Sequence, residues 1–149
     1  MRAVVQRCLG ARILVEGQER ASIGPGLVVF LGIGRGDTSE TGRSMAERIF
    51  RLRAFEDGEG RMNLALSESG GAVLLVPQFT VMGDLRRGHR PSFHEAAEPQ
   101  TAEGLWRFVG ESLARMGVPV AYGVFGARME VQVRNDGPVT LLLSSDRAF

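Results

Sequence analysis

Two short segments of the chain carry residue types from which a reaction site can be built. The first is Pro77-Gln78-Phe79-Thr80, which places a carboxamide, an aromatic ring and a hydroxyl group directly after an apolar run at 72–76. Rigid scaffolds commonly present functional groups where a buried strand ends. A carboxamide can orient a substrate, whereas a threonine hydroxyl becomes a nucleophile only when a base activates it. No base stands beside Thr80 in the sequence.

The second segment, residues 135–140 (Asn-Asp-Gly-Pro-Val-Thr), joins two predicted strands. Asp-Gly is a favoured pair in hairpin turns, so residue types alone predict an ordinary turn here. A proline after glycine also permits a cis peptide bond, although only about 5–6% of X–Pro bonds in folded proteins are cis.

Three arginines, Arg86, Arg87 and Arg90, lie close together in a polar stretch that is predicted to be a loop from Asp84 to Pro99. Such a cluster can contact phosphates without reading a base sequence, or it can be a solvated loop, and charge alone favours neither. The 18 basic residues are all arginine, yet the net charge is only +1. Because no overall positive field attracts nucleic acid, any contact with RNA must come from a local patch, and no DNA partner is expected.

The remaining reactive residue types fit structural roles better than chemical ones. His89 and His94 are the only histidines, and they are predicted to lie on the surface because a zinc site needs three or four ligands. Cys8 lies in an apolar run, which favours a buried and unreactive thiol. The glycine-rich run at 32–36 has the wrong spacing for a dinucleotide-binding turn, and a chain without lysine has no P-loop. No metal or other cofactor is predicted.

Length and composition indicate one domain in a reducing compartment. A chain of 149 residues, 44% of them apolar, fits a single domain over residues 1–149. No run of about 18 apolar residues occurs, so no membrane-spanning segment is predicted. One cysteine excludes an intrachain disulfide, and the start of the chain lacks the apolar core of a signal peptide. Both features favour a cytoplasmic protein.

The elements that must position these residues predict an α+β fold. Helices are predicted where apolar residues recur with a helical period, at 38–55 and 101–116; strands are predicted at 3–8, 12–16, 27–33, 62–66, 72–76, 118–125, 128–134 and 139–144. The first two strands should form a hairpin-like pair around Gly10. Because strands come in groups and do not alternate strictly with helices, we expect a curled, mixed sheet with two main helices.

Six segments taken together resemble the D-aminoacyl-tRNA deacylase family, also called D-tyrosyl-tRNA deacylases. The two segments described first match the family signatures Ser-Gln-Phe-Thr and Asn-x-Gly-Pro-x-Thr. The other four are residues 5–7 (Val-Gln-Arg), 24–27 (Gly-Pro-Gly-Leu), 61–64 (Arg-Met-Asn-Leu) and 88–93 (Gly-His-Arg-Pro-Ser-Phe). One segment alone would be weak evidence, but six in the family's order cover essentially the whole chain.

The resemblance implies an enzyme of translational proofreading. Such enzymes hydrolyse the ester between a D-amino acid and the terminal adenosine of tRNA, and they also accept mischarged glycyl-tRNA. The resemblance further implies a barrel-like homodimer with an active site at each side of the interface and no cofactor. Gly137 and Pro138, joined by a cis bond, would enter the partner's pocket and reject L-amino acids. Arg7 would hold that loop in shape, and Asn135 belongs to the same motif.

These implied roles agree with the chemistry of the residues. Rigid main-chain atoms can reject an L side chain because they cannot rotate away, and glycine has no Cβ to block a close approach. Main-chain N–H groups around Phe79 and Thr80 would stabilise an oxyanion, while Gln78 would orient the substrate. The family is read as using the 2′-hydroxyl of the tRNA, so Thr80 is treated first as a binding residue.

One position departs from the family pattern. Pro77 stands where the family most often has serine, and proline offers neither an N–H nor a hydroxyl. Some related deacylases that begin this motif with Pro-Gln have altered chiral specificity and a trans glycine-proline bond. Since Phe79 and Arg7 keep the standard pattern, the cis bond and D selectivity are expected here. Two other functions fit part of the sequence: a non-catalytic tRNA-binding module on the same dimeric scaffold, and a general esterase.

Overall fold

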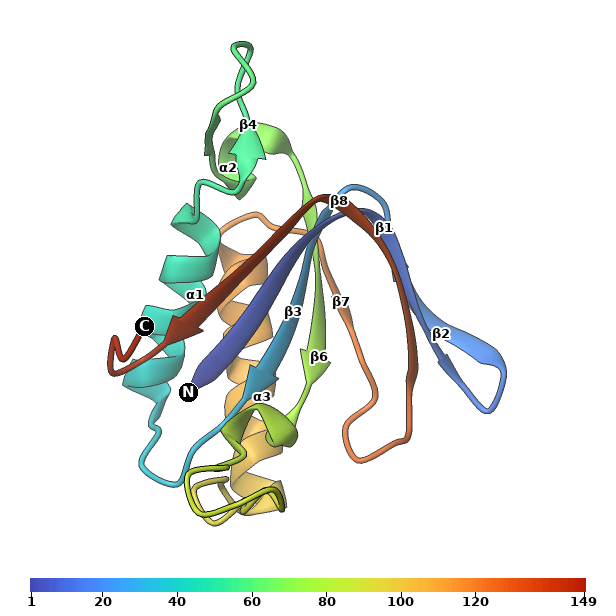
Figure 1. Cartoon of the computed structure of the whole chain (residues 1–149). Coiled ribbons are helices and arrows are strands. Elements are labelled where there is room, and N and C mark those ends of the chain that lie inside the picture. The colour runs from blue at the N-terminus through green and yellow to red at the C-terminus, as the bar shows by residue number, and fades with distance from the viewer.

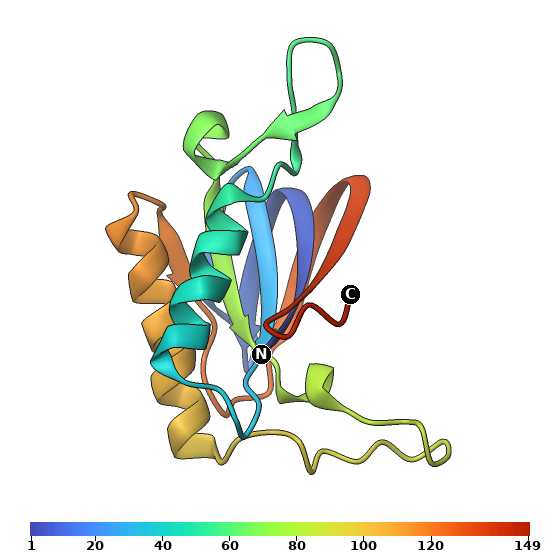
Figure 2. The same ribbon diagram turned by 90° about the vertical axis from the view of Figure 1, so that its left-hand side faces the viewer.

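The computed structural model describes all 149 residues and has a curled six-stranded sheet with two long helices on one face (Figures 1 and 2). The strands are β1 (Arg2–Val15), β2 (Gln18–Ile23), β3 (Gly26–Gly32), β4 (Phe55–Glu56), β5 (Met62–Leu64), β6 (Ala72–Pro77), β7 (Val120–Tyr122) and β8 (Glu130–Ser144). The helices are α1 (Ser39–Arg51), α2 (Leu66–Ser69), the 3-10 turn η1 (Phe79–Met82) and α3 (Pro99–Arg115). The predicted α+β class is confirmed.

Strand β1 organises the sheet. Its first half lies between β3 and β8, its second half lies between β2 and β8, and all three pairings are antiparallel. Strands β3, β6 and β7 are parallel to one another, so the sheet is mixed, as predicted. Irregular pairing between Gln6 and Gly10 interrupts the ladder with β8, and such bulges bend a strand and increase its twist. The sheet therefore curls towards a barrel.

Two predicted hairpins are wrong. Residues 3–8 and 12–15 belong to the single strand β1, and the turn comes later, at Glu16 and Gly17, which both have positive φ angles (51° and 78°). Residues 130–134 and 139–144 likewise belong to one strand, β8, and residues 128 and 129 precede it. In both cases each half of the strand pairs with the same neighbour, so the glycines lie in bulges and not in turns.

The two long helices lie close to their predicted positions. Thr38 caps α1 with a hydrogen-bonded capping box formed with Thr41, and the helix ends at Arg51, before the predicted limit. Pro99 occupies the first turn of α3, where its missing N–H costs nothing. Strand β7 is shorter than predicted, and α2 was not predicted at all. None of the helices combines the length and apolar character needed to cross a bilayer.

Two apolar cores stabilise the sheet from its two sides. The larger lies between the helices and the sheet and includes Met45 and Ile49 of α1 and Trp106 of α3. The smaller, which includes Ile13 and Leu74, fills the inside of the curl. Because β3 and β6 are covered on both faces, their sequences are continuous apolar runs instead of alternating patterns. Their carboxyl ends are therefore held rigidly, and the candidate site lies there.

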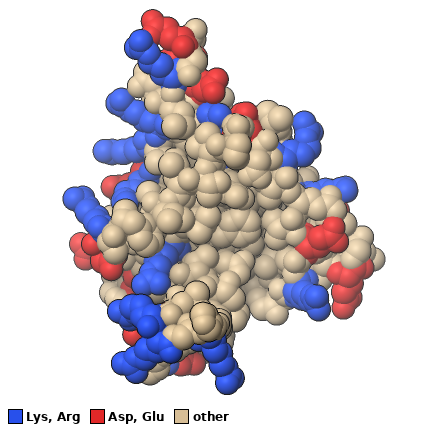
Figure 3. Space-filling view, viewed as in Figure 1, with Lys and Arg blue, Asp and Glu red and all other residues tan.

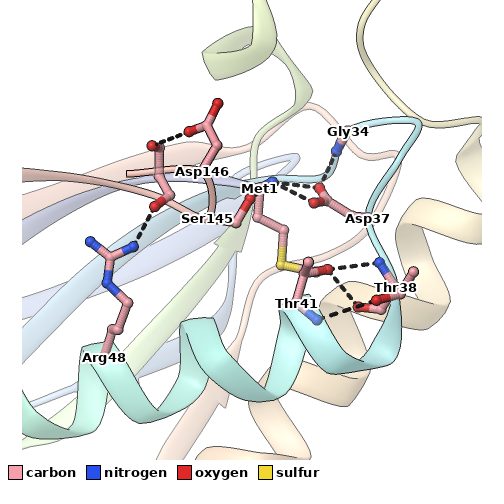
Figure 4. Close-up of polar contacts among 9 residues, drawn as sticks. Met1, Gly34, Asp37, Thr38, Thr41, Arg48, Ser145 and Asp146 are labelled. Carbon is pink, nitrogen blue, oxygen red and sulfur yellow. Dashed lines mark hydrogen bonds and ion pairs between the residues drawn. The ribbon is translucent and has the colours of Figure 1, made fainter. Parts of the chain in front are cut away.

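A polar cluster fastens the chain ends to the turn that follows β3 (Figure 4). The ammonium group of Met1 donates to Asp37 at 2.6 Å and to the hydroxyl of Ser145 at 2.8 Å. Asp37 also accepts a hydrogen bond from the main-chain N–H of Gly34 at 2.6 Å. Arg48 of α1 donates to the carbonyl of Ser144. Strands β1 and β8 are thereby joined to the turn at 33–37.

Candidate functional site

A cavity of about 650 Å³ opens where β3 and β6 end. Apolar residues dominate its wall, with a few polar groups among them, which is the usual composition of a small-molecule site. The wall comes from the end of β6 (Pro77, Gln78 and Phe79), the loop before α3 (Phe93, Ala96, Ala97 and Glu98), α3 (Ala102 and Trp106) and the loop between β7 and β8 (Phe125, Gly126, Ala127 and Met129). The predicted segment 77–80 therefore borders a real cavity.

Aromatic rings shape this cavity. Phe79, which is 59% exposed, meets Phe93 edge to face with 5.1 Å between the ring centroids. Trp106 and Phe125 also line the cavity, with 5.9 Å between their ring centroids. A planar, largely apolar group fits between such rings better than a strongly hydrated one.

The polar side chains at this place can orient a substrate but cannot activate a nucleophile. The Gln78 side-chain amide donates to the hydroxyl of Thr80, which is exposed and lies beside the cavity wall instead of on it. An amide cannot take up a proton, and no imidazole or carboxylate is bonded to Thr80. At the rim, Arg35 pairs with Glu98 at 3.7 Å.

Main-chain donors are also available here. The turn η1 begins at Phe79, and its first internal hydrogen bond runs from the N–H of Val81 to the carbonyl of Gln78 at 3.4 Å. The N–H groups of Phe79 and Thr80 precede that bond, so they have no partner within the turn.

Arg7 forms a second polar centre, in the interior of the protein. It is only 4% exposed, and its guanidinium donates to the carbonyl oxygens of Ala54 at 2.9 Å and Asp136 at 3.3 Å. It also pairs with the carboxylates of Asp136 at 3.3 Å and Glu56 at 3.5 Å. This one side chain links β1, β8 and the segment that enters β4.

The segment 135–140 bulges out of β8 directly opposite Arg7. Gln6 pairs with Thr140 and Cys8 pairs with Asn135, so four residues of β8 face the single residue Arg7. The bond between Gly137 and Pro138 is cis, and both residues are exposed. Gly137 has a φ angle of +119°, and a Cβ there would lie 2.9 Å from a methyl carbon of Val139. Only glycine adopts this conformation without strain.

Within one chain, the structure does not bring the two groups of predicted site residues together. Arg7 pairs with Leu27 at the start of β3, whereas Leu31, near its end, lines the cavity. Leu27 and Leu31 are four residues apart in the strand, which is a distance of about 13 Å along the sheet. Gln78 and Phe79 are therefore at one end of β3, and Gly137 and Pro138 are near the other.

The loop that carries Arg86, Arg87 and Arg90, which we call the arginine loop, has internal hydrogen bonds of its own. An isolated bridge between Asp84 and Ser92 closes it, and Arg86 forks onto the Asp84 carboxylate at 2.9 and 2.7 Å. This hydrogen-bonded contact holds the pKa of Asp84 well below its usual range. Arg87 and Arg90 form no salt bridge.

The other reactive side chains lie where the sequence places them. His89 and His94 are exposed, which confirms the surface prediction. Cys8 is buried, and burial raises the pKa of its thiol. No group of three or more histidine, cysteine or acidic residues lies close enough together to hold a metal ion.

Sequence reasoning missed several cavity residues, among them Arg35, Trp106, Phe125 and Met129. Arg35 stands in the glycine-rich turn after β3, so the strand-end argument that found Gln78 would also have found it. Trp106 could be read from the sequence only as a core residue of its helix, since nothing there says that one edge borders a cavity.

Comparisons with known proteins agree over nearly the whole chain. Residues 4–144 match the family described as D-Tyr-tRNA(Tyr) deacylase. The chain is 50% identical to a D-aminoacyl-tRNA deacylase of Symbiobacterium thermophilum over 149 residues, covering 100% of this chain and 99% of that protein. It is 51% identical to a D-aminoacyl-tRNA deacylase of Myxococcus xanthus over 145 residues, covering 97% and 95%.

Two solved structures share the fold. A c-Myc DNA unwinding element binding protein superposes with a TM-score of 0.92 at 37% identity, covering 97% of this chain and 98% of that one. A probable eukaryotic D-amino acid tRNA deacylase superposes with a TM-score of 0.81 at 19% identity, covering 95% and 97%. The second likeness concerns the fold alone.

Proposed function

This chain belongs to the D-Tyr-tRNA(Tyr) deacylase family, and we propose that it hydrolyses the ester that joins a D-amino acid to the end of a tRNA. The products are the free tRNA and the D-amino acid, and mischarged glycyl-tRNA is a second substrate. Relatives about 50% identical over the full chain bear the name D-aminoacyl-tRNA deacylase. The structural observation that carries the proposal is the cavity at the ends of β3 and β6, with Gln78 and Phe79 on its wall.

The terminal adenosine fits the chemistry of this cavity. Its base is planar and apolar on both faces, and Phe79, Phe93 and Phe125 offer aromatic surfaces on the wall. The Gln78 amide can hydrogen bond to the ribose or to the ester carbonyl, because an amide both donates and accepts. A cavity of about 650 Å³ lies within the range usual for small-molecule sites.

Hydrolysis of an activated ester needs a site for the developing negative charge more than it needs a protein nucleophile. The N–H groups of Phe79 and Thr80 serve as that oxyanion site, since they have no partner within η1. The neighbouring 2′-hydroxyl of the tRNA assists the reaction, and water completes it. Thr80 binds substrate and does not attack it, because its hydroxyl is bonded to an amide that cannot remove its proton.

Chiral selection comes from a second copy of the chain. Gly137 and Pro138 are exposed and lie far from the cavity of their own chain, so they can reach a cavity only across a subunit interface. The main chain of the partner subunit's Gly137 would face the substrate α-carbon and reject any substituent in the L position. Arg7 fixes this bulge from inside its own subunit, and Asn135 begins it.

The sheet offers a surface for such a dimer. Strand β8 pairs only with β1, so its other edge is open along 15 residues. Figure 3 shows a broad uncharged area over this side of the molecule, with charged side chains around its border. Leu142, on β8, and Phe79 are both more than half exposed in the single chain. Long unprotected edges and apolar patches of this kind are typical of interaction surfaces.

The arginine loop provides the contact with tRNA. Arg86, Arg87 and Arg90 are exposed, and contacts from such side chains to phosphates position a nucleic acid without reading its sequence.

The decisive experiment follows the decay of D-tyrosyl-tRNA and L-tyrosyl-tRNA with and without the purified chain. We expect fast loss of the D ester and none of the L ester above the spontaneous rate. Binding of tRNA with no turnover of either ester would favour the non-catalytic tRNA-binding module. Equal hydrolysis of simple esters that lack RNA would favour a general esterase.

A further inference from the structure

A second cavity, of about 480 Å³, lies beside the first, and no apolar residue lines it. Its wall consists of Asp84, Arg86, Arg87, Arg90, Ser92, His94 and Glu95. Three guanidinium groups and two carboxylates meet there, so the cavity carries a net positive charge. Figure 3 shows arginine side chains gathered at this end of the molecule, where Figure 1 shows the loop that leads to α3.

One short segment separates the charged cavity from the apolar one. Ser92 and His94 line the charged cavity, whereas Phe93, between them in sequence, lines the apolar cavity. Likewise, Glu95 lines the charged cavity and Ala96 lines the apolar cavity. The two cavities are therefore neighbours on either side of a single stretch of main chain.

The three guanidinium groups of the charged cavity are not equivalent. Arg86 is held by Asp84 through two short hydrogen bonds, and that contact lowers the pKa of Asp84, which stays ionised at neutral pH. The charges of Arg86 and Asp84 therefore offset each other. Arg87 and Arg90 have no carboxylate within salt-bridge distance, so their positive charges are available to an anion.

We propose that the charged cavity binds the phosphate that precedes the terminal adenosine of the tRNA, and that Arg87 and Arg90 are its ligands. The inference rests on the proposed function for the identity of the substrate. A nucleotide joins an apolar base to an anionic phosphate through one ribose, and here an apolar and a cationic cavity adjoin across one segment. Guanidinium forks match the oxygen geometry of a phosphate. The end of every tRNA would be recognised alike, because a phosphate carries no sequence information.

Binding of adenosine 5′-monophosphate, compared with adenosine, tests the proposal without any need for catalysis. The parent chain should bind the nucleotide about tenfold more tightly than the nucleoside at low salt, which corresponds to about 1.4 kcal/mol, because hydrogen bonds to a charged phosphate outweigh its loss of hydration. The double variant Arg87→Gln/Arg90→Gln should bind adenosine as the parent does and lose the preference for the nucleotide. The variant Arg20→Gln, which removes an exposed arginine on β2, should keep the preference.

Kinetics then connect the cavity to the substrate. In the double variant we expect a raised KM for D-tyrosyl-tRNA, an unchanged kcat, and unchanged hydrolysis of the D-tyrosyl ester of adenosine, which has no phosphate. Equal binding of nucleotide and nucleoside by the parent, or a preference that survives in the double variant, overturns the proposal. If the nucleotide preference behaves as expected but no ester is hydrolysed, the proposed function fails and the phosphate site stands.

Discussion

The guanidinium of Arg7 lies 3.3 Å from the carbonyl oxygen of Asp136, so a buried side chain of β1 holds the main chain of the bulge in β8. The same guanidinium donates to the carbonyl of Ala54 at 2.9 Å, and so it also holds the segment that leads into β4. The guanidinium suits this role because it presents five donors in a fixed planar fork, so it can serve acceptors on two different segments at once. The position of Gly137 and Pro138 therefore depends on a residue 130 positions away in sequence, which is close only because β1 and β8 pair.

Replacement of Arg7 by lysine is predicted to loosen this bulge. An ammonium group cannot reach all of these acceptors, and buried carbonyls left without a donor cost about 1–3 kcal/mol. We expect Arg7→Lys to lower the free energy of unfolding by about 2 kcal/mol in urea and to reduce discrimination between D- and L-tyrosyl-tRNA. Arg12→Lys, on the exposed part of the same strand, is the control and should change neither. If Arg7→Lys discriminates between the D and L esters as the parent does, the bulge keeps its shape without the guanidinium.

Gly137→Ala is predicted to impair chiral selection more than folding. A Cβ at Gly137 would lie 2.9 Å from a Val139 methyl carbon and would project from main chain proposed to face the substrate. Gly17→Ala is a matched control, because Gly17 also has a positive φ but sits in an open turn with no neighbour within 4 Å. Both variants should lose about 1–2 kcal/mol of stability. Only Gly137→Ala should lose D/L selectivity, and equal selectivity in both variants would refute the main-chain filter.

Thr80→Val is predicted to keep measurable deacylation. The substitution preserves the shape of the side chain and removes only its hydroxyl, which is bonded to the Gln78 amide and to no base. We expect kcat to fall by no more than about tenfold, the effect of losing one modest hydrogen bond. Complete loss of turnover with unchanged thermal unfolding would make Thr80 the nucleophile instead.

The pKa of Cys8 predicts the direction of a pH effect on stability. Burial raises the pKa of the thiol in the native state, whereas the thiol of the unfolded chain ionises at about pH 8.5. Above that pH the native state binds more protons than the unfolded state, so the free energy of unfolding should fall as pH rises. The contribution is fully present below about pH 8.5. Urea midpoints measured on both sides of this value should show the decline in the parent and a smaller one in Cys8→Ala, and equal declines would contradict the assignment.

The sequence predicted the elements whose signal is local. The helical period of α3 and the apolar runs of β3 and β6 were read correctly, because burial dictates those residue types directly. The sequence predicts turns at Gly10 and at Asp136-Gly137, where the structure has bulges, because the same residue types permit both. Which of the two forms is decided by pairing with a distant strand, and that pairing leaves no local pattern.

The site was predictable to the extent that it sits at a strand end. Gln78 and Phe79 follow β6, and buried strands commonly present functional groups at their ends. The sequence therefore predicts the one part of the cavity wall that these two residues form. Its other walls come from α3 and from the loop before β8, and only the tertiary structure brings them together. The charged cavity was visible merely as an arginine cluster, because the alternation of Ser92 and Phe93 between two cavities depends on how the loop is held.

Asp37→Ala is predicted to be among the most destabilising single substitutions in the chain. The variant leaves the ammonium of Met1 buried with only the Ser145 hydroxyl as acceptor, and it also removes the acceptor of the Gly34 N–H. Removing one partner of a buried ion pair costs about 3–5 kcal/mol, a large share of the roughly 5–15 kcal/mol that stabilises a typical domain. Gly34 bridges to Ala96 on the cavity wall, so the KM for D-tyrosyl-tRNA should rise as well. Urea unfolding of Asp37→Ala beside Glu47→Ala, an exposed acid on α1, measures the difference, because loss of an exposed charge should cost less than about 0.5 kcal/mol. If the two variants unfold alike, then water, and not Asp37, satisfies the ammonium of Met1.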